Sequence, residues 1–334
     1  MRSVFALLAV VSLFASGCGL FDDGNTVRVY TGRHYDLEQA FEQFTAETGI
    51  DVEFLSGDDA ELRERIAAEG EDTTADIYMT VDAGNLWKAA EDGLLARLNS
   101  PTLNEAVPAG LRDSEGRWYG LAMRARTVMY NPQRVQESAF DAEDTYAQLA
   151  EPEWRGRLCM RNSTSPYTQS LVAGLIAAHG ERRATEIVRG WVDNDVAIFE
   201  NDIQILENID AGRCDVGLTN HYYLARLLVD QPDLSVTPFW ASQDGRGVHV
   251  NISGAGVLAD ADNPAKAQRL IEWLATTGQR SFVEGNHEFP TNPKVTPEPV
   301  IAGFGEFDYE PINAEAYGQL NARAVTLMNE VGYR

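Results

Sequence analysis

Two adjacent tyrosines, Tyr222 and Tyr223, stand where the sequence pattern changes from strand to helix. An apparent strand covers residues 214–218, a turn covers 219–221, and an apparent helix covers 224–229. In chains that alternate strands and helices, ligands usually bind at such turns. Phenolate oxygen is a hard anionic ligand of the kind that hard trivalent cations favour. The pair therefore predicts a ferric-iron site, although two half-buried aromatic residues at a helix start would show the same pattern.

Two earlier turns carry donors of the same kind. His34 and Tyr35 follow an apparent strand over 26–30, and Tyr167 follows another over 157–160. With the tyrosine pair, this makes five hard nitrogen and oxygen donors at three strand-to-helix turns. A bound trivalent cation strongly lowers the pKa of its ligands, so it can ionise phenols whose free pKa is about 10. Zinc would be expected to use more Cys and His, and calcium more carboxylates.

Two arginines lie in the long apolar run 118–130 that ends at Asn131-Pro132. Side chains alternate along a strand, so Arg124 and Arg126 can point to the same face. We expect them to offset the charge of the phenolates as outer-sphere cations. The alternative is a salt bridge at the surface or at a hinge.

Cys159 and Cys214 precede Tyr167 and Tyr222, respectively, by the same eight residues. If both cysteines lie on neighbouring parallel strands, a disulfide would fix two ligand-bearing loops side by side, provided that the chain is exported to an oxidising compartment. The alternative is two free, buried thiols.

The order of the predicted elements indicates two α/β halves. Strands and helices alternate from residue 26 onward, and again from residue 157, which predicts parallel sheet with helices on its faces. The runs 118–130 and 248–258 are long enough to cross between the halves, and this predicts a clamshell that closes around a ligand by hinge motion. The sequence contains no phosphate loop, HExxH, GxSxG or CxxC motif, so we do not expect an enzyme.

Composition and the first residues point to an exported protein. The formal charge of −24 argues against nucleic acid as a partner. Arg2 and the apolar run 4–14 predict a signal peptide over 1–17, since the run is too short for a permanent membrane span. Ser16-Gly17-Cys18 predicts lipidation of Cys18, with residues 18–25 as a tether; ordinary signal cleavage at the same place is the alternative.

Six stretches, in the same order along the chain, make it resemble the ferric-iron-binding proteins that serve ABC importers. They are VYTGRHYD (29–36), ADIYMTVDAGNL (75–86), LAMRARTVMYNP (121–132), RGRLCMRNSTSPYTQSLV (155–172), CDVGLTNHYYLARL (214–227) and VNISGAGVL (250–258). The resemblance implies Tyr35, Tyr167, Tyr222 and Tyr223 as iron ligands, with His34 as a further ligand and Arg124 or Arg126 as the compensating cation. Val81 stands where another branch of the family has Glu, which favours the tyrosine-rich branch.

From this resemblance we expect a type II periplasmic-binding-protein fold with two α/β lobes, a hinge and a ligand cleft. Lobe 1 is expected over 26–123 plus 253–300, and lobe 2 over 124–252 plus 301–334. The function implied is capture of Fe³⁺ and its delivery to an ABC permease and its ATPase, by a monomeric periplasmic protein that touches the membrane only through a lipid anchor. The alternative function is binding of an organic ligand or iron chelate, such as a polyamine or sugar, with the tyrosines stacking rather than coordinating.

Overall fold

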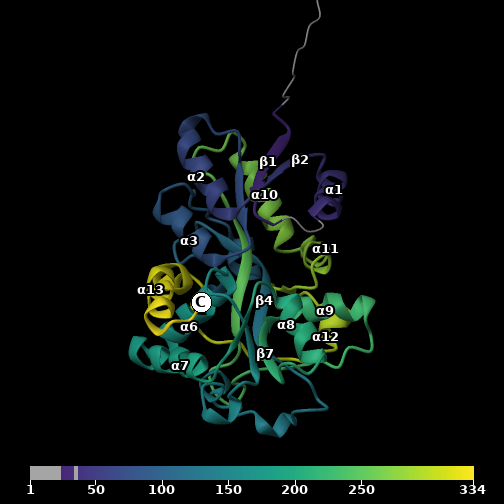
Figure 1. The fold of residues 1–334 in the computed structure, drawn as a ribbon. Helices are drawn as coiled ribbons and strands as arrows, with labels where there is room; N and C mark the ends of the chain where they lie inside the picture. The colour runs from purple at the N-terminus through teal and green to yellow at the C-terminus, as the bar shows by residue number, and fades with distance from the viewer. Residues whose placement is uncertain (1–23, 34–36) are drawn as a thin grey trace, which may run out of the picture.

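The computed structural model describes residues 24–33 and 37–334. The predicted signal peptide 1–17, Cys18 and the pair His34–Tyr35 lie outside the described residues. Figure 1 shows an upper and a lower α/β half, joined by long strands that run between them. Within the described part of the chain, strands and helices follow one another as the sequence predicts.

The strands form one sheet with the order β2-β1-β3-β9-β4-β7-β5-β6, and β8 and β10 add to β4. The upper half in Figure 1 holds the parallel strands β1, β2 and β3, and the lower half holds the parallel strands β5, β6 and β7. The bounds are β1 (Thr26–Thr31), β2 (Asp51–Ser56), β3 (Ile77–Thr80), β4 (Tyr119–Tyr130), β5 (Leu158–Arg161), β6 (Ala197–Phe199), β7 (Val216–Asn220), β8 (Thr237–Phe239), β9 (His249–Val257) and β10 (Phe289–Pro290).

Strands β4 and β9 connect the two halves because each changes partner along its length. The first part of β4, from Tyr119 to Arg126, pairs with β9, and its last part, from Arg126 to Tyr130, pairs with β7. The end of β9 in turn pairs antiparallel with β3. Every residue of both strands is buried, which explains their nearly continuous apolar sequence. The lobe boundaries given above remain predictions.

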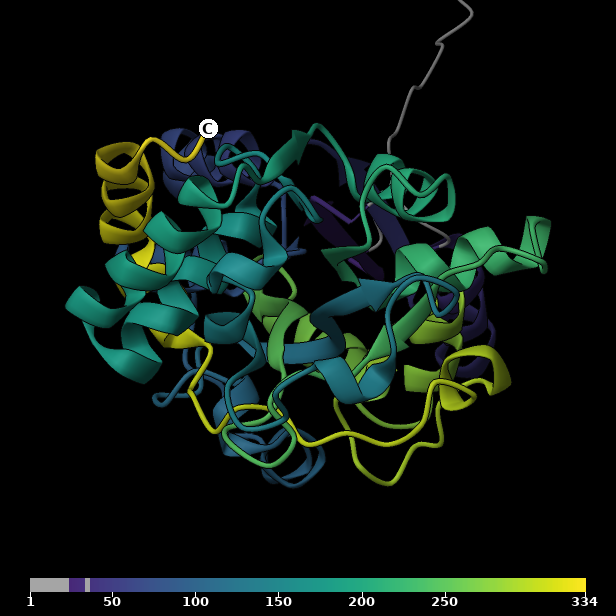
Figure 2. The same ribbon diagram turned by 60° about the horizontal axis from the view of Figure 1, so that its bottom comes forward.

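Helices cover both faces of the sheet in each half (Figure 1). The C-terminal helix α13 packs on α6, α7 and α3, so it contacts both halves; the turned view shows it in yellow beside the teal helices (Figure 2). The bounds are α1 (Leu37–Thr48), α2 (Asp59–Glu69), α3 (Ala83–Glu91), α4 (Pro101–Ala106), α5 (Thr145–Gln148), α6 (Pro166–His179), α7 (Glu181–Asp193), α8 (Asp202–Asp210), α9 (His221–Asp230), α10 (Pro264–Leu274), α11 (Gln279–Glu284), α12 (Pro299–Ala302) and α13 (Glu315–Val331).

The structure corrects the expected turn before the tyrosine pair. Strand β7 continues to Asn220 and helix α9 begins at His221, so no separate turn covers residues 219–221. Asn220 is the extended N-cap residue of α9, and the ring of His221 that follows accepts a hydrogen bond at Nδ1 from the backbone N–H of Ala125 at 3.2 Å. This bond ties the first residue of α9 to the crossing strand β4. Tyr222 and Tyr223 therefore lie in the first turn of α9.

Candidate metal site

Three tyrosines converge at the carboxyl ends of two neighbouring strands. Tyr167 lies in the first turn of α6, which follows β5, and Tyr222 lies in the first turn of α9, which follows β7. Strands β5 and β7 pair in parallel, so the two helix starts lie side by side. The Oη of Tyr222 donates a hydrogen bond to the Oη of Tyr167 at 3.2 Å, and the rings of Tyr222 and Tyr223 are 4.3 Å apart with a 34° tilt.

Two of these phenols, Tyr222 and Tyr223, are held in their neutral form. Burial raises the pKa of Tyr222 well above its ordinary value, and the neighbouring Tyr167 and Tyr223 raise it further. Burial likewise raises the pKa of Tyr223. Ionising these phenols therefore needs a strong positive charge close to their Oη atoms, which a trivalent cation supplies.

Guanidinium groups surround the three phenol rings. The Cζ of Arg124 lies 5.4 Å from the centre of the Tyr167 ring, and that of Arg161 lies 5.1 Å from the same ring. The Cζ of Arg226 lies 5.2 Å from the centre of the Tyr222 ring. Each distance is within the range of a cation–π contact. These cations are placed to offset the negative charge of phenolates.

Sequence reasoning found Arg124 but missed Arg161 and Arg226. Both had a signal. Arg226 is four residues after Tyr222 on a helix, a spacing at which side chains meet. Arg161 is the last residue of the strand that leads to Tyr167.

Arg126 forms a cluster with Asp202 and Arg161, and this cluster connects it to the Tyr167 ring through Arg161. Its Nη1 donates to Oδ1 of Asp202 at 2.8 Å, and the Nη1 of Arg161 donates to Oδ2 of the same carboxylate at 2.8 Å. The backbone N–H of Asn220, just before α9, also donates to Oδ1 of Asp202 at 3.2 Å. Asp202 is fully buried. We call Arg126, Asp202 and Arg161 the second-lobe arginine cluster; it supports both the Tyr167 ring and the start of α9.

Arg124 belongs to a matching cluster with Arg33 and Glu288. Glu288 is fully buried, forms an ion pair with the Nη1 of Arg33, and lies 3.9 Å from the Nη1 of Arg124. Burial by itself would raise the pKa of Glu288, but the charges of Arg33 and Arg124 hold it below its usual range. We call Arg33, Glu288 and Arg124 the hinge arginine cluster.

His221 is fixed as a neutral ring beside the tyrosines. Because its Nδ1 accepts from the Ala125 N–H, its Nε2 carries the proton, which it donates to the carbonyl of His287 at 3.0 Å. Burial lowers its pKa to about 4, so the ring stays neutral at physiological pH. It packs edge-on against Tyr222 with ring centres 6.0 Å apart.

The first-lobe donors predicted from the sequence, His34 and Tyr35, lie outside the described residues. The chain that leads to them is described as far as Arg33, at the carboxyl end of β1. A pocket beside this point is lined by both halves of the molecule: Gly32, Asp59, Val81 and Asn85 contribute from the first half, and Arg161 and Pro166 from the second. This pocket lies beside Pro166, the residue before Tyr167, where we predict the cleft between the lobes.

A disulfide joins Cys159 of β5 to Cys214 ahead of β7, with their Cα atoms 5.9 Å apart. Both cysteines are buried among apolar side chains that include Met129, Ile205 and Leu224. The bond links the two strands whose following helices carry Tyr167 and Tyr222.

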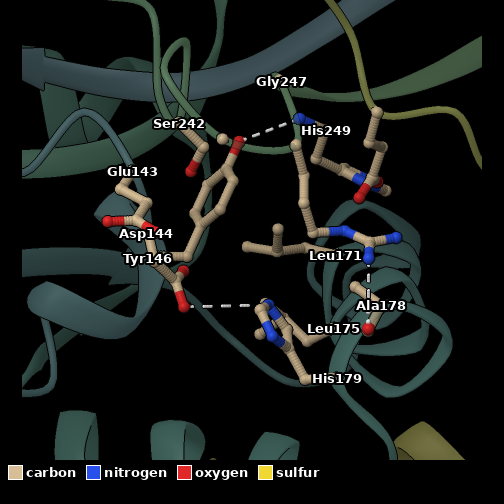
Figure 3. Close-up of a pocket in the computed structure, with 13 residues that line it drawn as sticks. Glu143, Asp144, Tyr146, Leu171, Leu175, Ala178, His179, Ser242, Gly247 and His249 are labelled. Atoms are coloured by element: carbon tan, nitrogen blue, oxygen red, sulfur yellow. Dashed lines mark hydrogen bonds and ion pairs between the residues drawn. The ribbon is translucent and has the colours of Figure 1, made fainter.

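A second pocket, of about 230 Å³, has Tyr146 and His249 in its lining but not Tyr167, Tyr222 or Tyr223 (Figure 3). Its lining groups pair with one another. His249 contacts Glu310 at 2.6 Å and donates its backbone N–H to the Oη of Tyr146 at 3.0 Å, and Arg246 donates to the carbonyl of Ala178 at 3.2 Å. These contacts account for the polar groups of His249, and we assign the pocket no ligand.

Comparison with known proteins identifies several relatives. The family model described as bacterial extracellular solute-binding protein matches residues 72–301. Iron uptake protein A1 of Synechocystis is 36% identical over 98% of this chain and 95% of its own length, and the Fe(3+)-binding periplasmic protein of Serratia marcescens is 27% identical over 98% and 96%.

Solved structures agree with these sequence relatives. The Trichodesmium protein IdiA (FutA), in complex with iron and citrate, superposes with a TM-score of 0.88 at 42% identity, covering 92% of this chain and 100% of that one. The ferric iron-binding protein A of Mannheimia haemolytica, in an open conformation, superposes with a TM-score of 0.86 at 30% identity, covering 92% and 99%.

Proposed function

The chain belongs to the bacterial extracellular solute-binding protein family, and we propose that it captures Fe³⁺ through tyrosinates in the cleft between its lobes and hands it to an ABC importer. The predicted type II periplasmic-binding-protein fold and the resemblance to ferric-binding proteins are confirmed. The relatives named above are binding proteins, and we propose that this chain likewise carries a cargo and catalyses no reaction.

The observation that supports iron most directly is the convergence of Tyr167, Tyr222 and Tyr223. Three phenolates and one Fe³⁺ together carry no net charge, so the cation and its ligands neutralise one another in a site of low dielectric. The hydrogen bond between the Oη atoms of Tyr222 and Tyr167 shows that these two oxygens reach the same point. Arg124 and Arg161 place two positive charges at the Tyr167 ring.

The first lobe would complete the coordination shell. We propose that His34 and Tyr35 supply donors from the segment that follows Arg33, so that closing the lobes adds ligands to an ion already held by the second lobe. With a fourth phenolate the site would carry about one negative charge, and the nearby arginines would offset it.

The transport partners are an ABC permease, which would dock on the closed form, and its ATPase. We propose that the protein acts in the periplasm as a monomer, anchored to a membrane face through lipidated Cys18, with ordinary signal cleavage as the alternative. Among the helices of the described residues, none combines the length and apolar character needed to cross a membrane.

A titration with ferric nitrilotriacetate tests the proposal. Tyrosinate-to-iron charge transfer should produce a visible absorption band that saturates at one iron per chain. Tyr222→Phe should abolish most of this band, because it removes the phenol whose Oη is hydrogen-bonded to the Oη of Tyr167 and is therefore placed to share the iron with it.

Tyr309→Phe is the matched control, since Tyr309 pairs with Val248 and is not one of the three converging phenols. It should titrate like the wild type. A wild-type protein that stays colourless at every iron concentration would refute the iron site and favour an organic ligand that stacks on the tyrosines.

A further inference from the structure

Tyr333 is a buried tyrosine that contacts the end of strand β5. Helix α13 ends at Val331, and Gly332 follows with a φ of 78°, in the left-handed region that glycine favours. The backbone N–H of Tyr333 then donates to the carbonyl of Met328 at 2.9 Å. This turn directs the Tyr333 side chain into the protein, where its Oη donates to the carbonyl of Arg161 at 2.7 Å.

The carbonyl of Arg161 lies at the point where the chain leaves β5 for Tyr167. It accepts a second side-chain hydrogen bond, from the Oγ1 of Thr168 at 3.3 Å. The side chain of the same arginine donates to Asp202 at 2.8 Å and lies 5.1 Å from the centre of the Tyr167 ring. Fixing this carbonyl therefore fixes the backbone that carries both the Arg161 guanidinium and, further along the chain, the Tyr167 phenol.

Helix α13 supports the same loop at a second point. The Nδ2 of Asn321 donates to the Oε1 of Gln169 at 3.1 Å, and the Nε2 of Gln169 donates to the carbonyl of Ser163 at 3.0 Å. Ser163 belongs to the loop between β5 and α6, and α13 packs on α6. Contacts from α13 and from Tyr333 therefore hold both the start and the middle of the loop that precedes Tyr167.

Tyr167 depends on this support more than Tyr222 does. Tyr222 is 2% exposed, and its helix α9 begins directly after β7. Tyr167, in contrast, is partly exposed and follows a loop. Packing therefore constrains Tyr167 less, and the position of its Oη beside that of Tyr222 follows from how the loop is held.

We propose that Tyr333 is a positioning residue for iron binding, because its hydrogen bond to Arg161 fixes the loop that places the Tyr167 phenol. The inference rests on the proposed iron site. It goes further by giving a role in that site to a tyrosine that forms neither a hydrogen bond nor a ring contact with the three converging phenols in the described part of the chain. Without the Tyr333 hydroxyl, the Arg161 carbonyl keeps only the Thr168 hydroxyl as a side-chain donor, and the loop gains freedom.

Tyr333→Phe keeps the buried ring and removes only the hydroxyl. The tyrosinate charge-transfer band should still form, because all three phenols remain, but its maximum should shift in wavelength as the Tyr167 oxygen moves. The affinity for Fe³⁺, measured by competition with citrate, should fall about threefold to tenfold, which is the size of effect that one lost hydrogen bond produces.

Tyr119→Phe is the matched control. Tyr119 is fully buried at the start of β4, and its Oη donates to the carbonyl of Leu98 at 3.4 Å. Removing either hydroxyl should lower the urea midpoint of the iron-free protein by a similar small amount, but Tyr119→Phe should keep the wild-type band and iron affinity. Asn321→Ala, which removes the contact to Gln169, should shift the band and weaken iron binding about twofold to fivefold; it carries the test if Tyr333→Phe does not fold.

Three outcomes separate the inference from the proposed function. Wild-type iron affinity or an unshifted band in Tyr333→Phe, or in Asn321→Ala where the first variant does not fold, would overturn the inference and leave the iron site standing. Equal losses of iron affinity in Tyr333→Phe and Tyr119→Phe would also overturn it, because the effect would then follow stability rather than the position of Tyr167. A wild-type protein without the band would refute the iron site instead.

Discussion

The two arginine clusters contain the same kinds of charged group but connect different parts of the molecule. Each consists of two arginines around one fully buried carboxylate, and each takes one arginine from β4. The second-lobe arginine cluster joins β4, β5 and α8, which already pack together around β7. The hinge arginine cluster joins β1, β4 and the segment after α11. The second-lobe arginine cluster therefore supports the phenols from within the second lobe, whereas the hinge arginine cluster joins parts of the chain that lie far apart in the sequence.

This difference predicts distinct consequences when either cluster is broken. Damage to the second-lobe arginine cluster should disturb the phenols and the fold of that lobe together. Damage to the hinge arginine cluster should lower stability but leave the phenols in place. The predictions below test this division, beginning with the largest effect.

Asp202→Asn should have the largest effect. The substitution leaves the buried Arg126 and the partly buried Arg161 facing a side chain with no charge, and breaking a buried pair in this way typically costs about 3–5 kcal/mol of the free energy of unfolding. It also weakens the hydrogen bond that holds the Asn220 N–H at the start of α9. We expect a lower urea midpoint together with a weaker charge-transfer band, whereas Glu288→Gln, which breaks the hinge arginine cluster, should lower the urea midpoint but keep the band.

Asp210→Asn, at the exposed end of the same helix, serves as the control for Asp202→Asn. Its Oδ1 accepts only the backbone N–H of Ser235 among the contacts in the described structure. A surface change of this kind should alter the free energy of unfolding by less than about 1 kcal/mol. An intact band in Asp202→Asn would show that its cluster does not position the phenols.

Removing the disulfide should weaken the second lobe without removing its site. A bond that closes a separation of 55 residues constrains the unfolded chain and is expected to contribute about 2–4 kcal/mol. Cys159→Ala/Cys214→Ala should therefore unfold at lower urea concentration but still form the coloured iron complex, because the β5–β7 pairing remains.

The reduced wild-type protein provides a second measurement of the same effect. Dithiothreitol should lower the urea midpoint of the wild type and leave that of the double variant unchanged. Loss of colour in the folded double variant would mean that the disulfide, rather than the strand pairing, holds Tyr167 beside Tyr222.

The smallest effect is expected in the first lobe, at Asp59. Asp59 as a whole is partly exposed. Its Oδ1 atom, however, is buried from solvent and has no hydrogen-bond partner among the described residues. Burial, together with the charge of Asp82, raises its pKa to about 7. The folded protein therefore keeps this proton between about pH 4 and pH 7 while the unfolded chain loses it, so this group's contribution to stability is complete below pH 4 and declines as the pH rises to 7.

Asp59→Asn should remove that pH dependence. The variant should be more stable than the wild type at pH 8, by roughly 1–2 kcal/mol after allowing for screening of a partly exposed residue, and by clearly less at pH 4.5. Urea unfolding at the two pH values measures the difference. Asp58→Asn is the control, since an amide oxygen can still cap α2 as the Asp58 carboxylate does; an equal gain at both pH values for Asp59→Asn would contradict the assignment.

Local sequence patterns predicted much of the fold because they depend on neighbouring residues. The alternation of strands and helices, the two crossing strands and the placing of Tyr167 near Tyr222 followed from periodicity and from the rule that parallel strands present their carboxyl ends on one edge. The start of α9 was misplaced, because pairing with β4 continues strand β7 as far as Asn220, which the local pattern does not show. The roles of His34, Tyr35 and Cys18 stay predictions.

The sequence by itself determined which groups are available for chemistry: three tyrosines after two strands, two cysteines at matched spacing, and two arginines on one crossing strand. Only the tertiary structure decided which partners Arg124 and Arg126 contact. Arg124 and Arg126 are equivalent by alternation, yet one contacts Tyr167 and Glu288 and the other contacts Asp202. The two carboxylates come from distant parts of the chain, and no local pattern encodes a buried ion pair whose partners meet only when the sheet and the hinge have formed.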